Sequence, residues 1–198
     1  MGLFSEKEVL KLPKADIEYY PNFLAQDDAD SYFKYLKEKV PWQQDSITVF
    51  GKTYDQPRLT ALFGNNGKTY TYSNITMRPH RFEGKLLELK KRVDEYSKTE
   101  FTTCLLNLYR DGKDSNGWHA DDEKELGINP VIASISLGQE RFFHLRNKED
   151  KSLKHKIALE HGSLLLMKGV TQHHWQHQIP KTSRKIGERI NLTFRIIS

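Results

Sequence analysis

The sequence predicts an α+β fold that is mainly β: a double-stranded β-helix, or jelly roll, with N-terminal helices packed on one sheet. Two observations lead to this class. Two segments in the first half of the 198-residue chain carry apolar residues at helical spacing. About seven short β-like runs, divided by turn residues, then follow. We expect residues 1–198 to form a single domain, with the jelly-roll core at about 103–198.

The two helices are predicted from apolar spacing and end signals. In residues 27–40, acids occupy the first turn, lysines occupy the last, and Pro41 follows the end. In residues 83–97, one stripe of the helix carries the apolar and aromatic side chains, namely Leu86, Leu89, Val93 and Tyr96. Both helices are therefore expected to cover one face of a sheet.

Between these helices the pattern becomes β-like. Residues 46–54 indicate a hairpin that turns near Gly51, in which Phe50 would ordinarily be a strand residue facing the core. In residues 68–73, Tyr70 and Tyr72 lie on one face of an extended segment. Paired tyrosines at this spacing are typical of half-buried sheet positions, and a base-stacking role is the alternative.

The later β-like runs include two that carry polar side chains on one face. The predicted strands are residues 103–109, 131–137, 141–145, 157–159, 163–167, 173–178 and 190–197. In the last of these, one face carries apolar residues and the other carries Arg189, Asn191, Thr193 and Arg195. The polar face is either the solvent-exposed side of an edge strand or a binding site for a small dianion. The second alternative follows because arginine binds carboxylates through two parallel hydrogen bonds. Asn107 and Tyr109 likewise share a face of the first strand.

A candidate metal site lies in residues 117–123. His119 and Asp121 stand two apart, so in extended backbone their side chains point to the same side. A further histidine would complete a two-histidine, one-carboxylate set, which suits non-haem Fe(II) and leaves coordination positions open. His173, His174 and His177 are all candidates, and periodicity does not choose between them. Zinc would also accept such ligands.

Composition limits the class of protein. The chain has a net charge of +5 and a pI near 9.1, which permits a polyanionic partner such as nucleic acid. Cys104 is the single cysteine, so an internal disulfide is excluded and a reducing compartment is expected. The sequence shows no membrane-length apolar run and no signal-peptide hydrophobic region, so we expect no membrane association.

The order of these motifs resembles the AlkB family of Fe(II)/2-oxoglutarate dioxygenases, over roughly residues 48–197. The resemblance rests on residues 107–112, 119–126, 161–165 and 189–195, and is closest to the eukaryotic nuclear DNA-repair homologues and their bacterial relatives. It implies that His119, Asp121 and His177 bind Fe(II) as the catalytic metal. It also implies that Arg195 binds the distal carboxylate of 2-oxoglutarate, in a pocket lined by Asn107, Tyr109, Arg189, Asn191 and Thr193.

The resemblance further implies oxidative demethylation of N-alkylated bases of the 1-methyladenine and 3-methylcytosine type in DNA, with O2 consumed and succinate, CO2 and formaldehyde released. The base would be flipped out of the duplex. Residues 45–80 would recognise the nucleotide, with a pocket wall at Tyr70, Tyr72 and Ser73, and His119 on the opposite side. Phe50, with Gly51 and Lys52, matches a finger that fills the gap left by the base, which implies a preference for duplex DNA.

The remaining implied contacts are with the base edge and the phosphates. Asp122 and Glu123 would read the base edge, although solvated acids beside a metal ligand are the ordinary alternative. Arg58 and the lysines of residues 181–185 are candidates for phosphate contacts.

Two other functions stay open at this point: a dioxygenase that acts on RNA or protein, and a catalytically silent module that binds damaged bases. We expect a monomer, located in the cytoplasm of a bacterium or the nucleus of a eukaryote.

Overall fold

The computed structural model describes residues 7–49, 52–65, 70–72 and 75–197. The helices are α1 (Gln26–Lys39), α2 (Gly84–Ser97) and the short α3 (Thr171–His174), with a 3-10 turn at Lys124–Leu126. The strands are β1 (Glu8–Val9), β2 (Asp16–Tyr20), β3 (Ser46–Val49), β4 (Lys52–Asp55), β5 (Leu59–Gly64), β6 (Tyr70–Tyr72), β7 (Ile75–Met77), β8 (Thr103–Tyr109), β9 (Asn116–His119), β10 (Ile132–Gly138), β11 (Arg141–Asn147), β12 (Lys154–Leu159), β13 (Ser163–Lys168), β14 (Trp175–Ile179) and β15 (Arg189–Arg195).

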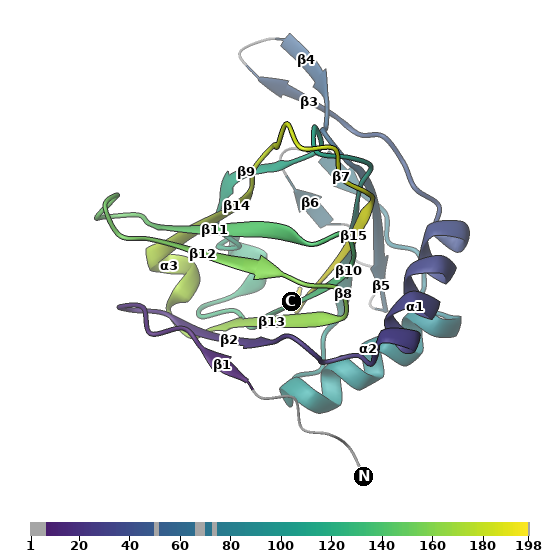
Figure 1. Cartoon of the computed structure of the whole chain (residues 1–198), viewed down its shortest axis with the longest axis horizontal. Coiled ribbons are helices and arrows are strands. Elements are labelled where there is room, and N and C mark those ends of the chain that lie inside the picture. The colour runs from purple at the N-terminus through teal and green to yellow at the C-terminus, as the bar shows by residue number, and fades with distance from the viewer. Residues whose placement is uncertain (1–6, 50–51, 66–69, 73–74, 198) are drawn as a thin grey trace.

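Within the described residues, the strands form two main antiparallel sheets and two small hairpins (Figure 1). The seven-stranded sheet has the order β1-β2-β13-β10-β15-β8-β5, and the four-stranded sheet has the order β12-β11-β14-β9. The hairpins are β3-β4, which projects from the body, and β6-β7. The predicted jelly roll is confirmed.

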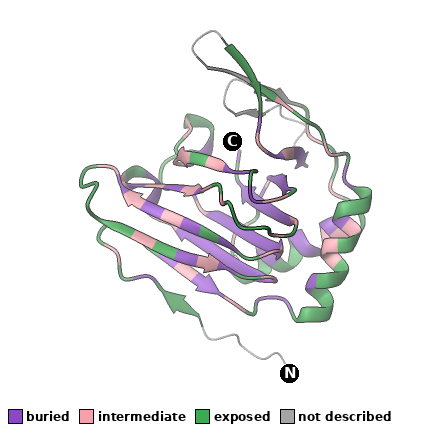
Figure 2. Cartoon of the chain, turned by 45° about the horizontal axis from the view of Figure 1, so that its top comes forward, coloured by how far each residue is buried: buried purple, intermediate pink, exposed green. Residues whose placement is uncertain are grey.

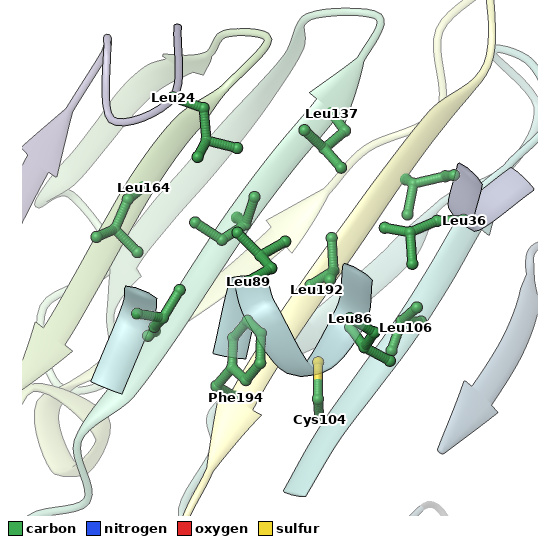
Figure 3. Packing of buried hydrophobic residues seen from close by; sticks show 14 of the residues in the cluster. Leu24, Leu36, Leu86, Leu89, Cys104, Leu106, Leu137, Leu164, Leu192 and Phe194 are labelled. Carbon is green, nitrogen blue, oxygen red and sulfur yellow. The ribbon is translucent and has the colours of Figure 1, made fainter. Parts of the chain in front are cut away.

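The seven-stranded sheet separates two apolar cores. On its outer face, Leu36 of α1 and Leu89 of α2 pack with Leu106, Leu192 and other residues of the sheet (Figure 3). On its inner face, a second cluster that includes Leu105, Leu145 and Leu165 fills the space between the two sheets. This second layer holds the polar residues described below.

Strand β15 lies in the interior of the sheet, hydrogen-bonded to β10 on one side and to β8 on the other. All seven of its residues are buried, as are all seven of β8. The interpretation of residues 190–197 as an edge strand with a wet outer face is therefore wrong. Figure 2 shows how burial gathers along the strands, while the outward sides of the helices are exposed.

Strand β2 is an addition that the sequence pattern did not predict. It pairs with β13 over the whole of its length. Burial raises the pKa of Glu18, but hydrogen bonds from Tyr20 and Lys7 and the charge of Lys168 outweigh burial and lower that pKa to about 2. These contacts fix β2 on the sheet, so that the jelly roll extends beyond residues 103–198.

The predicted helices and most strands agree with the structure to within a few residues. Residues 173–178 are an exception, because this run begins in the helical turn α3 and becomes extended only at Trp175. The Thr171 hydroxyl donates a hydrogen bond to the Lys168 carbonyl, 2.6 Å away, and the His173 backbone N–H donates to the Val170 carbonyl. These local bonds compete with strand pairing.

No helix in the described part of the chain has the length and apolar character needed to cross a membrane.

Candidate active site

Three potential metal ligands converge between the two sheets. His119 ends β9, Asp121 follows it by two residues, and His177 lies on β14, directly opposite His119 in the sheet register. One ligand atom from each residue lies within 4.8 Å of the other two. Asp121 and His177 are buried and His119 is partly buried. This arrangement offers two imidazoles and one carboxylate to a single point.

Asp121 is held from two sides. The Arg195 guanidinium donates from Nε and Nη2 to Asp121 Oδ1, at 3.2 and 2.6 Å. The Asp121 backbone N–H donates to Oε1 of the buried Gln172, 2.9 Å away. Burial would raise the pKa of Asp121, but the positive charge of Arg195, the two neighbouring histidines and the hydrogen bond from Arg195 together outweigh burial and lower that pKa to about 2. The side chain is therefore an ionised, oriented carboxylate.

The two imidazoles are held as neutral rings. The His177 ring stacks on Phe143, with centroids 4.9 Å apart and planes 26° apart. Burial and then His119 lower the pKa of His177 to about 3. Burial also lowers the pKa of His119, whose Nδ1 lies 2.8 Å from the Gly117 carbonyl. Neutral imidazole is the form that binds metals, so the donor set fits a divalent transition metal.

A cleft between the sheets connects this group with the polar face of β15. The residues that line it and that the sequence singled out are Asn107, Tyr109, His119, Asp121, His177, Arg189, Asn191, Thr193 and Arg195. Asn191 Nδ2 donates to the Ser134 hydroxyl at 2.8 Å, and the Thr193 hydroxyl donates to Asn191 Oδ1 at 3.0 Å. The polar face of β15 is thus fixed before any ligand enters.

Arg189 is the most unusual residue of the cleft. It is 1% exposed, and Nη2 donates to the Ser136 hydroxyl at 2.9 Å. Its Nε and Nη1 are buried and have no hydrogen-bond partner among the described residues. Burial lowers the pKa of Arg189 to about 10. Buried donors without partners are costly, so this guanidinium fits an anion inside the cleft.

The two arginines of β15 differ in their contacts. Arg195 donates two hydrogen bonds to Asp121, so its guanidinium lies beside the metal-ligand group. Arg189 lies at the other end of β15 and carries the unused donors. The expectation that Arg195 binds the distal carboxylate stays a prediction, and this contact with Asp121 weighs against it.

Comparisons with known proteins agree with this geometry. The 2OG-Fe(II) oxygenase superfamily model matches residues 16–195. The chain is 36% identical to DNA oxidative demethylase ALKBH2 of Arabidopsis thaliana over 92% of this chain and 67% of that protein. It is also 36% identical to ALKBH2 of Homo sapiens, over 90% of this chain and 72% of that protein. The chain belongs to the AlkB family.

Other AlkB relatives are more similar, but the chain covers a smaller share of their length. Alpha-ketoglutarate-dependent dioxygenase alkB homolog 3 of Bos taurus is 45% identical over 89% of this chain. The chain spans 64% of that protein, which is less than two thirds of its length. The solved structure of OsALKBH1 has a TM-score of 0.64 at 18% identity, covering 96% of this chain and 100% of that one, which supports the fold alone. The cofactors of this AlkB protein are Fe(II) and 2-oxoglutarate, as its family implies.

The AlkB cleft includes residues that sequence reasoning missed. Ser134 and Ser136 hold Asn191 and Arg189, and two serines alternating with apolar residues in the buried strand β10 were an available signal. Asn116 Nδ2 lies 3.3 Å from His119 Nε2, although the two residues are three apart. The register shift between β9 and β14 explains this, because the extra residue of a β-bulge lets both side chains face inward.

Two of the candidate histidines lie outside the cleft. His173 Nε2 is 3.1 Å from Asn129 Oδ1, and His174 Nδ1 is 3.3 Å from Glu149. His177 is the member of the three that joins His119 and Asp121.

The expected substrate contacts are only partly described. Phe50, Gly51 and Ser73 lie outside the described residues, and for Tyr70 and Tyr72 only the backbone, in strand β6, is described. Register pairs Val49 with Lys52 in the β3-β4 hairpin, and Lys52 is exposed.

Two base-edge candidates flank the metal group. Asp122 is exposed and accepts a hydrogen bond from Lys148 Nζ at 2.6 Å. Glu123 is partly buried, and burial raises its pKa.

The expectation that Arg58 contacts phosphate is wrong. Arg58 is 4% exposed, donates from Nε to Asn107 Oδ1 at 2.8 Å and donates from Nη1 to the Ser115 carbonyl. Its role is to fix Asn107 behind the cleft. Lys181 and Lys185 are exposed.

Proposed function

We propose that this protein is an Fe(II)/2-oxoglutarate-dependent dioxygenase that demethylates N-alkylated bases in DNA, of the 1-methyladenine and 3-methylcytosine type. The observation that carries the proposal is that a two-histidine, one-carboxylate group and a buried arginine with unused donors line the same cleft. The name of the relative DNA oxidative demethylase ALKBH2 supports the substrate class.

His119, Asp121 and His177 would hold the iron. This ligand set leaves positions open for the cosubstrate and O2. Bound Fe(II), with 2-oxoglutarate and O2, supplies the oxidation of the N-methyl group, with succinate, CO2 and formaldehyde as products. Arg195 and Gln172 keep Asp121 in place, and Phe143 keeps the His177 ring in place.

The cosubstrate would lie along the polar face of β15. We assign its distal carboxylate to Arg189, because this residue has buried donors without partners among the described residues. We assign its metal-binding end to the side of Arg195, which contacts Asp121. Asn107, Tyr109, Asn191 and Thr193 line the space between the two arginines.

The methylated base would be flipped out of the duplex to reach the metal. His119 on one side, with Tyr70, Tyr72 and Ser73 on the other, would enclose it, and Asp122 and Glu123 would read its edge. We assign nucleotide recognition to residues 45–80, within a single domain that spans the chain. Phe50, with Gly51 and Lys52, would fill the gap in the duplex, and Lys181 and Lys185 would contact phosphates.

We further propose that the protein acts as a monomer, in the nucleus of a eukaryote or the cytoplasm of a bacterium. The buried Cys104 and the net charge of +5 are compatible with a reducing compartment and a polyanionic partner.

The metal assignment is tested under anaerobic conditions. Adding Fe(II) and 2-oxoglutarate should give a visible charge-transfer band, which His177→Ala should lose. His174→Ala is the matched control, since His174 lies outside the cleft, and it should keep the band. A wild-type protein without a band would point to a zinc site or to a silent base-binding module.

The substrate assignment is tested by formaldehyde release from methylated single-stranded and duplex oligonucleotides, with methylated RNA as competitor. We expect duplex DNA to be preferred and Phe50→Ala to lose that preference. Equal activity of Phe50→Ala and wild type on duplex would remove the finger from the proposal. Preferential turnover of RNA would replace DNA as the substrate.

A further inference from the structure

A band of cations crosses the outer face of the four-stranded sheet, the face turned away from the metal group. Arg146 on β11 lies directly opposite Lys154 on β12, and His144 on β11 lies opposite Lys156. Like charges directly opposite each other destabilise a strand pair. The Arg146–Lys154 pair therefore makes this face a site that an anion would stabilise.

No carboxylate in the described part of the chain neutralises the charge of this band. Among residues 7–49, 52–65, 70–72 and 75–197, no carboxylate lies within ion-pair distance of Arg146, Lys154 or Lys156. Glu149, in the turn that joins the two strands, is within 3.7 Å of Lys14 and 3.3 Å of His174 instead. Arg146 donates from Nη2 to Gln176, and its buried Nε has no hydrogen-bond partner in the described part of the chain.

Two aromatic side chains hold the cations in place. The Arg146 guanidinium lies 4.3 Å from the centre of the Trp118 ring, and the Lys156 ammonium lies 3.4 Å from the centre of the Phe142 ring. Such cation–π contacts restrict the charged groups without cancelling their charge. Trp118, Arg146, Lys154 and Lys156 all line one hollow of this face. Aromatic rings interleaved with cations are typical of surfaces that follow a nucleic-acid strand.

The band begins next to the active site. Trp118 and His119 are neighbours on β9, where His119 faces the metal group and Trp118 faces Arg146 on the outer side. Strand β9 is the edge of the sheet, followed by β14, β11 and β12 (Figure 1). A strand whose reacting base lies beside His119 can therefore pass over this edge and continue across the outer face.

We propose that this outer-face band binds the sugar–phosphate backbone of the nucleic-acid substrate to one side of the reacting base. The band consists of Trp118, Phe142, His144, Arg146, Lys154 and Lys156. The inference rests on the proposed function in one respect, which is that the substrate is a nucleic acid. Burial and then Lys156 lower the pKa of His144, so the fixed positive charge comes from Arg146 and the two lysines.

The test is the Lys154→Ala/Lys156→Ala double variant of the full chain. Both lysines are exposed, so the fold should tolerate the change. The matched control is Lys34→Ala/Lys39→Ala, which removes two exposed lysines from α1, on the far side of the seven-stranded sheet. The measurement is fluorescence anisotropy with an unmethylated oligonucleotide of about 20 nucleotides, over a series of salt concentrations.

The double variant should bind roughly tenfold more weakly than wild type, and the slope of log affinity against log salt should fall by about 1 for each phosphate that is no longer neutralised. Formaldehyde release from a methylated trinucleotide should not change, because this substrate is too short to reach the band. An affinity and a salt slope equal to those of the control variant would overturn the proposal.

The two proposals fail separately. If the double variant binds normally while wild type releases formaldehyde from methylated DNA, the band is rejected and the proposed function stands. If the double variant binds weakly but wild type demethylates no methylated oligonucleotide, the band stands and the proposed function is rejected.

Discussion

Replacing Arg189 with methionine separates the roles of the two arginines. Arg189 is buried, and two of its nitrogens have no hydrogen-bond partner among the described residues. Methionine has a similar reach and no charge. Each buried, unsatisfied donor costs about 1–3 kcal/mol, so the ligand-free variant should be at least as stable as wild type despite losing the bond to Ser136.

The ligand-bound proteins should differ in the opposite direction. For wild type, 2-oxoglutarate at about 100 times its Kd stabilises the fold by about 2.7 kcal/mol, a rise in Tm of roughly 5–11 °C for a domain of this size. Charge-assisted hydrogen bonds contribute about 1.5–3 kcal/mol each. If Arg189→Met loses about 3 kcal/mol of binding energy, the rise at the same concentration is only about 1 °C.

The assay is thermal unfolding with Mn(II) in place of Fe(II), which prevents turnover. It compares 2-oxoglutarate with 2-oxobutyrate, which lacks the distal carboxylate. Arg189→Met should remove the preference of the protein for 2-oxoglutarate, whereas Arg195→Met should weaken the binding of both acids. If Arg189→Met keeps this preference and Arg195→Met loses it, the distal carboxylate belongs to Arg195 and our assignment is refuted.

Three further predictions concern the metal, the pH response and the core. Gln172→Met removes the acceptor for the Asp121 backbone and should weaken Co(II) binding by about 10–100-fold in a spectroscopic titration; unchanged affinity would mean that the bond does not orient Asp121. The lowered pKa of Glu18 contributes stability that is present above about pH 5 and is lost as pH falls toward 2. Glu18→Gln should therefore be less stable than wild type at pH 7, by up to roughly 3 kcal/mol in urea denaturation, with no difference near pH 2; Glu8→Gln, at an exposed position, is the control. Leu89→Ala, in the fully buried contact of α2 with the sheet, should cost about 2–5 kcal/mol by the same method, and a loss under 1 kcal/mol would contradict the packing.

Much of the cleft could be predicted from the sequence because strict alternation encodes it. Strands β8 and β15 pair in unbroken register from Arg189–Tyr109 to Arg195–Thr103. Residues two apart therefore face the same side, which brings Asn107, Tyr109 and the polar residues of β15 into one cavity. The helices were predictable for a similar reason, since a single apolar stripe meets a single sheet face.

The sequence predictions are wrong or incomplete where the alternation of side chains along a strand is interrupted, and where the position of a side chain depends on a contact with a residue distant in sequence. Asn116 was missed because a bulge, not visible in the sequence pattern, turns a residue three positions away to the same side as His119. The sequence suggested that Arg58 is a surface cation, but its guanidinium is inside the protein, where it donates hydrogen bonds to Asn107 and to the Ser115 carbonyl. Our assignment of Arg189 and Arg195 to the two ends of the cosubstrate rests on the contact of Arg195 with Asp121, and this contact joins residues 74 positions apart.

The opposite orientations of Trp118 and His119 have a consequence for protein engineering. Because adjacent residues of β9 serve the two sides of one sheet, the outer face that we propose to bind nucleic acid can be redesigned without moving a ligand atom. Substitution libraries on the outer positions of β9, β11 and β12 should yield variants with altered reach along a strand and unaltered iron chemistry. Insertions or deletions in the same stretch would exchange the two sides, so length changes there should be avoided.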